Sequence, residues 1–184
     1  MKHQDGQQRG GRQKRAGKPG FVRIIGGEWR GRRLPVLDLP GLRPSGDRTR
    51  ETLFNWLQPS IRGAHCADLF AGTGALGLEA ASRGAAEVTL IESMPPAMQA
   101  LRGLLATLGG AAGARVRLEQ TDALLWIATQ APHSLDLVFI DPPFDSGLDA
   151  RALESLTRHD LLRPGGLVYV EAARGAPPLQ PGPG

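Results

Sequence analysis

The sequence has one cysteine, few histidines, few aromatic residues and no long apolar run. Cys66 alone excludes an intrachain disulfide and favours a cytoplasmic setting. The four histidines show no ligand spacing, so no metal site is expected. No run approaches the roughly 18 apolar residues of a membrane helix, and the basic N-terminus has no apolar signal segment. These absences predict a protein without disulfides, metal or membrane anchor.

The chain length limits the number of domains. A chain of 184 residues can form one α/β domain with a buried core but is short for two. Cys66 falls in a predicted buried strand, which favours a small core residue over a nucleophile. Nothing in the sequence demands more than a monomer.

Charge is divided unevenly along the chain. The first 33 residues hold ten lysines and arginines against Asp5 and Glu28, a balance of +8, so the remainder carries −4. Residues 1–20 are rich in glycine, glutamine and arginine and are expected to form a disordered basic arm. Two interpretations stay open: a solubilising tail, or a segment that meets a polyanion.

A short apolar strand, a glycine turn and a helix are predicted over residues 66–82. Gly72, Gly74 and Gly77 fit a G-x-G-x-x-G pattern, which lets the backbone approach a nucleotide closely. Glu92 lies about twenty residues beyond Gly72, where a ribose-binding acid is expected. Taken alone, the pattern fits a dinucleotide enzyme as readily as a methyltransferase.

Asp68, just before the glycines, favours the methyltransferase. A carboxylate there would repel a pyrophosphate, whereas S-adenosylmethionine has no phosphate and carries sulfonium and ammonium groups. Four acids each follow a different predicted strand, which indicates an acidic site at one edge of a sheet. S-adenosylmethionine is therefore the predicted cofactor. The four acids are Asp68, Glu92, Asp122 and Asp141.

The rest of the chain alternates strands and helices, as in a parallel sheet with right-handed crossovers. The predicted architecture is an α/β Rossmann-like body at residues 47–173, with helices on both faces, within a methyltransferase domain at 21–173. A β-hairpin extension at 21–38 precedes the body, and a Pro/Gly connector spans 39–46. Further strands are predicted at 87–92, 115–119, 135–140 and 167–170, and helices at 47–57, 75–82, 95–108, 122–129 and 148–157.

The hairpin is predicted to have strands at 21–25 and 29–36 and to present a basic surface. Basic side chains beside an aromatic residue are a modest signal for nucleic-acid binding, although Trp29 could equally pack against the domain. The aromatic residues of the helix at 47–57, Phe54 and Trp56, are expected in the core, while Arg50 extends the basic surface. The candidate RNA-binding residues are Arg23, Trp29, Arg30, Arg32, Arg33, Arg43 and Arg48.

A second motif, Asp141-Pro142-Pro143-Phe144, follows the most apolar strand. The prolines stiffen the turn and leave carbonyls without competing N–H groups. An exocyclic amine on a planar base would bond to the Asp141 carboxylate and the Pro142 carbonyl, while Phe144 stacks on the ring. Holding that nitrogen about 3 Å from the sulfonium methyl is the main catalytic contribution. The plain alternative is a proline turn that ends a strand.

The sequence resembles the RsmD-type family of 16S rRNA guanine-N2 methyltransferases over roughly residues 21–171. The glycine motif is general to such enzymes, whereas the hairpin and the helix after the connector are far more specific, and their joint occurrence carries the assignment. The motifs are Val-Arg-Ile-Ile-Gly-Gly at 22–27 with Trp-Arg-Gly-Arg at 29–32, Leu-Arg-Pro at 42–44 with Asp-Arg at 47–48, Arg-Glu-Thr-Leu-Phe-Asn-Trp-Leu at 50–57, the glycine motif at 68–79, and Asp-Pro-Pro-Phe at 141–144.

The resemblance implies a class I methyltransferase fold and a set of site residues. It also implies a substrate that is an assembled small ribosomal subunit or a late precursor, with the basic N-terminal surface on rRNA phosphates. In such a site Asp68, Phe70, Gly72 and Gly74 would line the S-adenosylmethionine pocket, Glu92 would bind the ribose hydroxyls, Asp122 the adenine amino group, and residues 141–144 the guanine.

The C-terminal segment departs from the family pattern. Family members continue with two more strands, whereas residues 174–184 form a Pro/Gly-rich tail that cannot make central strands. Five sheet strands are therefore expected from residue 66 onward, without the last two. Two alternatives stay open: an adenine-N6 methyltransferase acting on DNA or RNA, or a non-catalytic RNA-binding or assembly factor if the shorter sheet does not hold S-adenosylmethionine.

Overall fold

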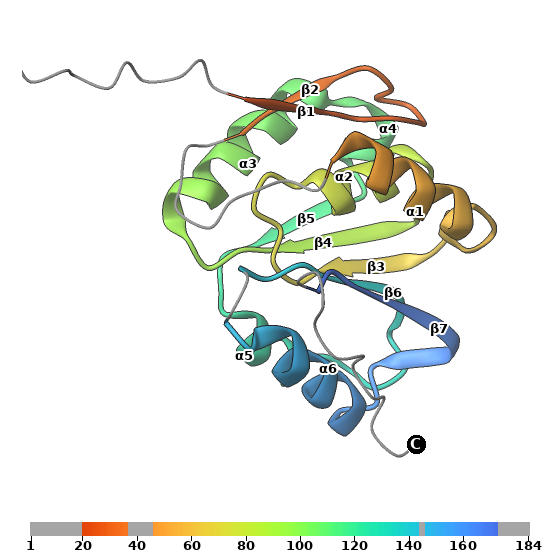
Figure 1. Cartoon of the computed structure of the whole chain (residues 1–184), viewed down its shortest axis with the longest axis vertical. Helices are drawn as coiled ribbons and strands as arrows, with labels where there is room; N and C mark the ends of the chain where they lie inside the picture. The colour runs from red at the N-terminus through yellow and green to blue at the C-terminus, as the bar shows by residue number, and fades with distance from the viewer. Residues whose placement is uncertain (1–19, 37–45, 144–145, 173–184) are drawn as a thin grey trace, which may run out of the picture.

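The computed structural model describes residues 20–36, 46–143 and 146–172. Within these ranges a parallel sheet of five strands forms the body, and a two-stranded antiparallel hairpin lies beside it (Figure 1). The predicted arm and tail, together with Arg43 and Phe144, lie outside the described residues, apart from Gly20. The sheet strands are β3 His65–Asp68, β4 Glu87–Ile91, β5 Val116–Glu119, β6 Leu135–Ile140 and β7 Leu162–Val170.

The strands run in the order β5-β4-β3-β6-β7, and every neighbouring pair is parallel. The chain builds outward from β3 to β5, returns across the sheet, and continues from β6 to β7. The strand order therefore reverses between β3 and β6, which is where open α/β sheets bind their ligands. The predicted Rossmann-like parallel sheet is confirmed, and all five strands expected from residue 66 onward are present.

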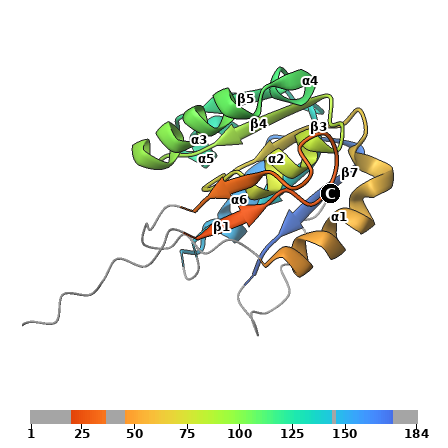
Figure 2. The same cartoon turned by 90° about the horizontal axis from the view of Figure 1, so that it is seen from above.

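Helices cover both faces of the sheet, as predicted (Figure 1). One face carries the hairpin and four helices, and the other carries two. Seen from above, the hairpin lies over α2, with α1 on one side and α3 on the other (Figure 2). The first group is α1 Asp47–Ile61, α2 Ala75–Ser82, α3 Pro95–Leu108 and α4 Gly110–Gly113, and the second is α5 Ala123–Ile127 and α6 Leu148–Arg158.

Strand β6 divides its side chains between two apolar clusters, one on each face of the sheet. Leu137 and Phe139 join the cluster that includes α1, α2 and the hairpin. Val138 and Ile140 join the cluster beneath α5 and α6. Burial on both faces explains why this strand is an uninterrupted apolar run at its end, as is usual for parallel sheets.

The hairpin is shorter than predicted, with β1 Phe21–Arg23 and β2 Arg33–Pro35. The segment between them leaves the ladder because it folds down onto α2. The N–H of Glu28 donates to the Ser82 carbonyl at 2.8 Å. Within the segment, the Ile24 N–H still donates to the Arg32 carbonyl at 3.0 Å and the Gly31 N–H to the Ile24 carbonyl at 2.8 Å, so hairpin pairing and the contact with α2 together set the conformation here.

Helix α1 is longer than predicted, and one of the two aromatic residues expected in the core is exposed. It continues past Pro59 to Ile61, whose side chain is buried. The prediction that Trp56 lies in the core is wrong, because Trp56 is 77% exposed. At about 100° per residue Trp56 lies some 200° from buried Phe54, on the opposite side of the helix.

Two further findings concern membrane-spanning helices and metal sites. Among the described residues, no helix has the length and apolar character that crossing a membrane requires. The same residues contain no group of three or more histidine, cysteine, aspartate or glutamate side chains able to hold a metal ion. Cys66 is buried. Burial, and to a smaller extent the charge of Asp136, raises the pKa of its thiol to about 12, so the thiol stays protonated.

Candidate functional site

Two of the predicted site acids start from neighbouring strand ends at the reversal point of the sheet. Asp68 is the last residue of β3 and is paired in register with Phe139 of β6. Asp141 follows β6 directly, and the Leu69 N–H donates to the Phe139 carbonyl at 3.1 Å. The charge of Asp68 contributes to the raised pKa of Asp141, so the two carboxyl groups interact.

Asp68 is a buried acid with one unused oxygen. It is 1% exposed, and its Oδ2 accepts a hydrogen bond of 2.9 Å from the Gly77 N–H at the start of α2. Its Oδ1 is buried without a well-formed hydrogen bond in the described part of the chain. The pKa of Asp68 is raised to about 7, because burial outweighs the opposing effect of the Gly77 and Phe70 N–H groups, and the charge of Glu92 acts in the same direction as burial.

A buried carboxylate oxygen without a hydrogen bond is costly, because it has lost its hydration without gaining a partner. A ligand that brings a positive charge or an N–H or O–H donor removes that cost. The role of Asp68 toward a cationic ligand stays a prediction.

The glycine turn brings α2 close enough to hold Asp68. Gly72 and Gly74 have φ of 50° and 76°, in the left-handed region that favours glycine, and Gly74 caps the helix. A side chain at Gly77 would collide with Leu90 of β4. Close approach of helix to strand therefore requires glycine at this position.

Glu92, after β4, contacts the glycine turn with one carboxylate oxygen and the backbone before α3 with the other. Oε2 accepts from the Gly72 N–H at 2.9 Å, and Oε1 accepts from the Met94 N–H at 2.7 Å. A carboxylate has about four lone-pair positions, so these bonds leave capacity for hydroxyl donors. The role of Glu92 on a ribose stays a prediction.

Asp122 and Phe70 complete the predicted cofactor set. Asp122 is exposed and caps α5, with Oδ1 accepting from the N–H groups of Leu124 at 2.8 Å and Leu125 at 3.1 Å. Its Oδ2 has no partner among the described residues. Phe70 is half-buried against the cluster beneath α5 and α6. Their proposed contacts with a cofactor are not tested by this geometry.

The Asp-Pro-Pro motif leaves β6 with Asp141 half-buried, Pro142 buried and Pro143 exposed. Burial, together with the charges of Glu171 and Asp68, raises the pKa of Asp141 to about 7. The catalytic roles predicted for Asp141 and the two prolines remain predictions.

Glu171 is an acid of this edge that was absent from the predicted set. Its N–H donates to the Ile140 carbonyl at 2.9 Å, which brings the end of β7 beside the start of the Asp-Pro-Pro motif. The Tyr169 hydroxyl lies 3.4 Å from Glu171 Oε2, and burial with these neighbouring charges raises the tyrosine pKa. The missed signal is the one used for the other acids, a carboxylate directly after a strand.

The basic surface predicted on the extension is largely exposed, with two corrections. Trp29 is 2% exposed, and its ring N–H donates to the Gly109 carbonyl at 3.2 Å, so the ring packs against the domain and cannot stack on a base. Arg33 lies over the Phe21 ring, 4.2 Å from its centroid. The exposed arginines of the predicted set are Arg23, Arg30, Arg32, Arg33 and Arg48.

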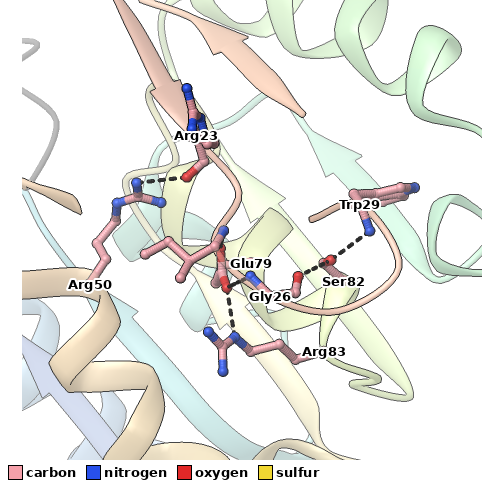
Figure 3. Close-up of polar contacts among 8 residues, drawn as sticks. Arg23, Gly26, Trp29, Arg50, Glu79, Ser82 and Arg83 are labelled. Carbon is pink, nitrogen blue, oxygen red and sulfur yellow. Dashed lines mark hydrogen bonds and ion pairs between the residues drawn. The ribbon is translucent and has the colours of Figure 1, made fainter. Parts of the chain in front are cut away.

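Arg50 is the second correction, because it is fully buried and does not extend the basic surface. Its guanidinium donates to the Arg23 carbonyl at 2.8 Å (Figure 3). It also donates to Asp47 Oδ1 at 2.6 Å. Arg50 therefore ties α1 to the extension.

A cluster of polar contacts, termed the clasp, fastens the extension to α2 (Figure 3). Buried Glu79 accepts from the Ile25 N–H at 2.7 Å, the Gly26 N–H at 2.8 Å and Arg83 Nε at 2.6 Å. Ser82 Oγ donates to the Gly26 carbonyl at 2.6 Å. Sequence reasoning missed the clasp, although an acid and a serine within an apolar helix are a usable signal.

One family model, described as Conserved hypothetical protein 95, matches residues 22–182. The chain belongs to this family. It is 50% identical over 154 residues to Ribosomal RNA small subunit methyltransferase D of Escherichia coli K12, covering 83% of this chain and 75% of that protein. The Haemophilus influenzae protein of the same name is 43% identical over 162 residues, covering 88% and 84%.

Solved structures of the same family agree with the fold. The putative methyltransferase yhhF from Escherichia coli superposes with a TM-score of 0.74 at 45% identity, covering 88% of this chain and 86% of that one. The resemblance stated from the motifs is confirmed. The acids that follow the carboxyl ends of the strands and the residues of the clasp all lie within the matched range. The basic arm, residues 1–20, precedes it.

Proposed function

We propose that the protein transfers a methyl group from S-adenosylmethionine to the exocyclic N2 of a guanine in 16S rRNA of the small ribosomal subunit. The observation that carries this is the pair of interacting carboxyl groups, Asp68 and Asp141, on neighbouring strand ends, one of them with an unused buried oxygen. The names of the relatives at 50% and 43% identity support the same reaction.

The acids of the carboxyl edge fit S-adenosylmethionine, which supplies an electrophilic methyl group bound to a sulfonium. Asp68 Oδ1 would receive a donor from the cationic part of the cofactor. Glu92 would accept from the ribose hydroxyls while it continues to hold the Gly72 N–H, and Asp122 Oδ2 would accept from the adenine amino group. The three acceptors follow the neighbouring strands β3, β4 and β5.

The Asp-Pro-Pro-Phe motif would hold the guanine. The Asp141 carboxylate and the Pro142 carbonyl would accept the two hydrogens of the exocyclic amine, which orients the nitrogen lone pair toward the methyl group. With its pKa raised to about 7, Asp141 is partly ionised at neutral pH and is suited to take the proton that the methylated amine releases. The protein would act as a monomer in the cytoplasm, where ribosomal subunits are found.

The direct test is transfer of a labelled methyl group to undermethylated small subunits, with naked rRNA and duplex DNA as parallel substrates. We expect label in subunit rRNA, recovered as N2-methylguanine. Label recovered as N6-methyladenine, or in DNA alone, would contradict the assignment. A folded protein that binds subunits but transfers no label would favour an RNA-binding factor.

The variant Asp141→Ala separates base binding from cofactor binding. We expect transfer to fall by at least about a hundredfold, since a positioned acid–base group contributes that much. Affinity for S-adenosylmethionine should stay within about tenfold, or about 1.4 kcal/mol. Glu154→Ala, at an exposed acid on α6, is the control and should leave both quantities unchanged. Loss of cofactor binding in folded Asp141→Ala would show that this acid faces the cofactor.

A further inference from the structure

A hollow of about 630 Å³ lies at the amino ends of the sheet strands, opposite the carboxyl ends that carry the acids. Its walls come from the segments that lead into β3, β4 and β5 and from the turn of the extension. It is therefore at the amino ends of the strands, remote from Asp68 and Asp141. The lining residues are Gly27, Glu28, Arg62, Gly63, Ser82, Arg83, Gly84, Ala86 and Arg115.

The hollow carries an excess of positive charge. Arg83 is held by Glu79 of the clasp through an ion pair of 2.6 Å. Arg62 and Arg115 have no ion pair and no side-chain hydrogen bond in the described part of the chain. The acid in the lining, Glu28, turns its Oε2 to the Ala112 N–H at 3.1 Å, where α4 begins. Two guanidinium groups thus remain available to an anion.

The walls of the hollow are fixed by backbone contacts. Gly27 has φ of 77°, and a side chain there would collide with the Ser82 carbonyl. The Gly63 N–H donates to the Gly84 carbonyl at 3.0 Å, which joins two of the walls. A preformed site loses little entropy when a ligand binds, so its affinity is not spent on ordering the loops.

We propose that this hollow binds a phosphodiester group of the RNA substrate, as a second anchoring site at the edge of the sheet opposite the reacting base. A guanidinium matches phosphate geometry with two parallel N–H donors, and arginine is suited to this role. The lining has no large apolar side chain, which argues against an apolar ligand or the apolar centre of a protein interface.

The extension connects the hollow to the basic surface already described. Exposed Arg30 lies in the same turn as Gly27, whose carbonyl accepts from the Arg30 N–H at 3.2 Å. The hairpin then carries Arg32 and Arg33 away from that turn (Figure 1). This continuity favours a nucleic-acid backbone over a free anion as the occupant.

Because the two sites lie at opposite ends of the strands, a substrate that contacts both must be extended. Sheet strands of four to six residues are about 13–20 Å long, so a single nucleotide cannot reach both edges. A folded rRNA region can contact the hollow with one phosphate while its target base is held at the carboxyl edge. The inference rests on the proposed function for its substrate class.

The test is the double variant Arg62→Gln with Arg115→Gln, assayed for binding to small subunits between 50 and 200 mM salt. Each lost phosphate contact should lower the slope of log affinity against log salt by about 0.7–0.9. We expect a loss of one to two such steps, a higher KM for subunits, and unchanged kcat and S-adenosylmethionine affinity. Neither side chain has a bond to lose, so thermal melting should match the wild type.

The matched control is Arg151→Gln with Arg158→Gln, which removes the same charge from exposed positions on α6. An unchanged slope in the Arg62 and Arg115 variant would overturn the proposal, as would an equal loss in the control, which would reveal a bulk charge effect. A competition with inorganic phosphate at constant ionic strength separates the sources of the anion. If the variant loses phosphate binding but keeps its RNA slope, the hollow is a free-anion site and the proposal is wrong.

These readouts are independent of methyl transfer. Wild-type protein that binds subunits with the full slope but labels no guanine would overturn the proposed function and leave the hollow supported. Normal labelling with no difference between the two double variants would do the reverse.

Discussion

Glu79 and Asp68 are both closed to solvent and both contact helix α2, but their carboxylates are satisfied to different degrees. Glu79 is 0% exposed, and its two oxygens accept from two backbone N–H groups and one guanidinium. Asp68 has a bond of 2.9 Å on one oxygen and no well-formed bond to the other among the described residues. One acid joins two parts of the protein, and the other retains capacity for a ligand.

The difference gives a physical criterion for separating structural acids from binding acids. A buried carboxylate with a complete set of donors stabilises the fold, and removing it leaves those donors unpaired. A buried carboxylate with an unused oxygen costs stability until a ligand arrives. The pKa of Asp68, raised to about 7 chiefly by burial, expresses the same cost as a preference for the neutral form.

The largest expected effect is on folding, from Glu79→Ala. This variant leaves Arg83 and the N–H groups of Ile25 and Gly26 without their acceptor, so the free energy of unfolding should fall by about 3–5 kcal/mol. Chemical denaturation measures this. Glu154→Ala is the control, because Glu154 forms the same type of i,i+4 ion pair with Arg158 at a solvent-exposed position. This variant should lower the free energy of unfolding by less than about 0.5 kcal/mol. Equal losses in the two variants would remove the distinction drawn for Glu79.

Asp68→Asn should lower cofactor affinity while leaving the free energy of unfolding largely unchanged. A charge-assisted hydrogen bond is worth about 1.5–3 kcal/mol, so affinity for S-adenosylmethionine should fall roughly 10- to 100-fold by calorimetric titration. Stability at pH 8 should be unchanged or higher than that of the wild type, because the variant buries no charge there. A loss of more than about 2 kcal/mol in unfolding free energy at that pH would show that Asp68 is a structural acid like Glu79.

The smallest expected effect on cofactor affinity is its dependence on pH. Asp68 and Asp141 have folded-state pKa values raised to about 7 from 3.8, so the unfolded chain ionises first and the stability of the free protein should decline between about pH 4 and 7. A cationic ligand favours the ionised acids, so affinity for S-adenosylmethionine should rise about tenfold from pH 5.5 to 8, with protons released on binding.

Titration calorimetry in two buffers of different ionisation enthalpy measures the proton release. The Asp68→Asn variant should show a flatter profile, because one of the two titrating groups is gone. Affinity that falls with rising pH would contradict the role of both acids.

Local sequence signals predicted the elements that have clear boundaries. The helix at 75–82 has the bounds of α2, from the glycine turn to Ser82, and the strand at 135–140 has the bounds of β6. Both are marked by glycine, proline or a run of apolar residues, so their ends are written in neighbouring positions. The acids at the carboxyl ends of the strands were predicted for the same reason, since each follows its own strand, and their roles stay predictions.

The remaining features depend on contacts between distant segments. Trp29 is buried by α2 and the residues around Gly109, and Arg50 by the extension, so neither position could be judged from its neighbours in sequence. Glu79 pairs with residues 53 and 54 positions away. Trp56 is a different failure, because a check of the helical phase against Phe54 would have placed it outside.

Helix α2 has eight residues, about 12 Å at 1.5 Å per residue, and is held at both ends. Its first turn donates from Gly77 to Asp68, and its last turn holds the extension through Glu79 and Ser82. One inserted residue between these points would rotate the last turn by about 100° and move it by about 1.5 Å, so both sets of contacts could not form together. Insertions and deletions among relatives should therefore fall in the connecting segments, while α2 keeps a constant length as the spacer between Asp68 and the extension.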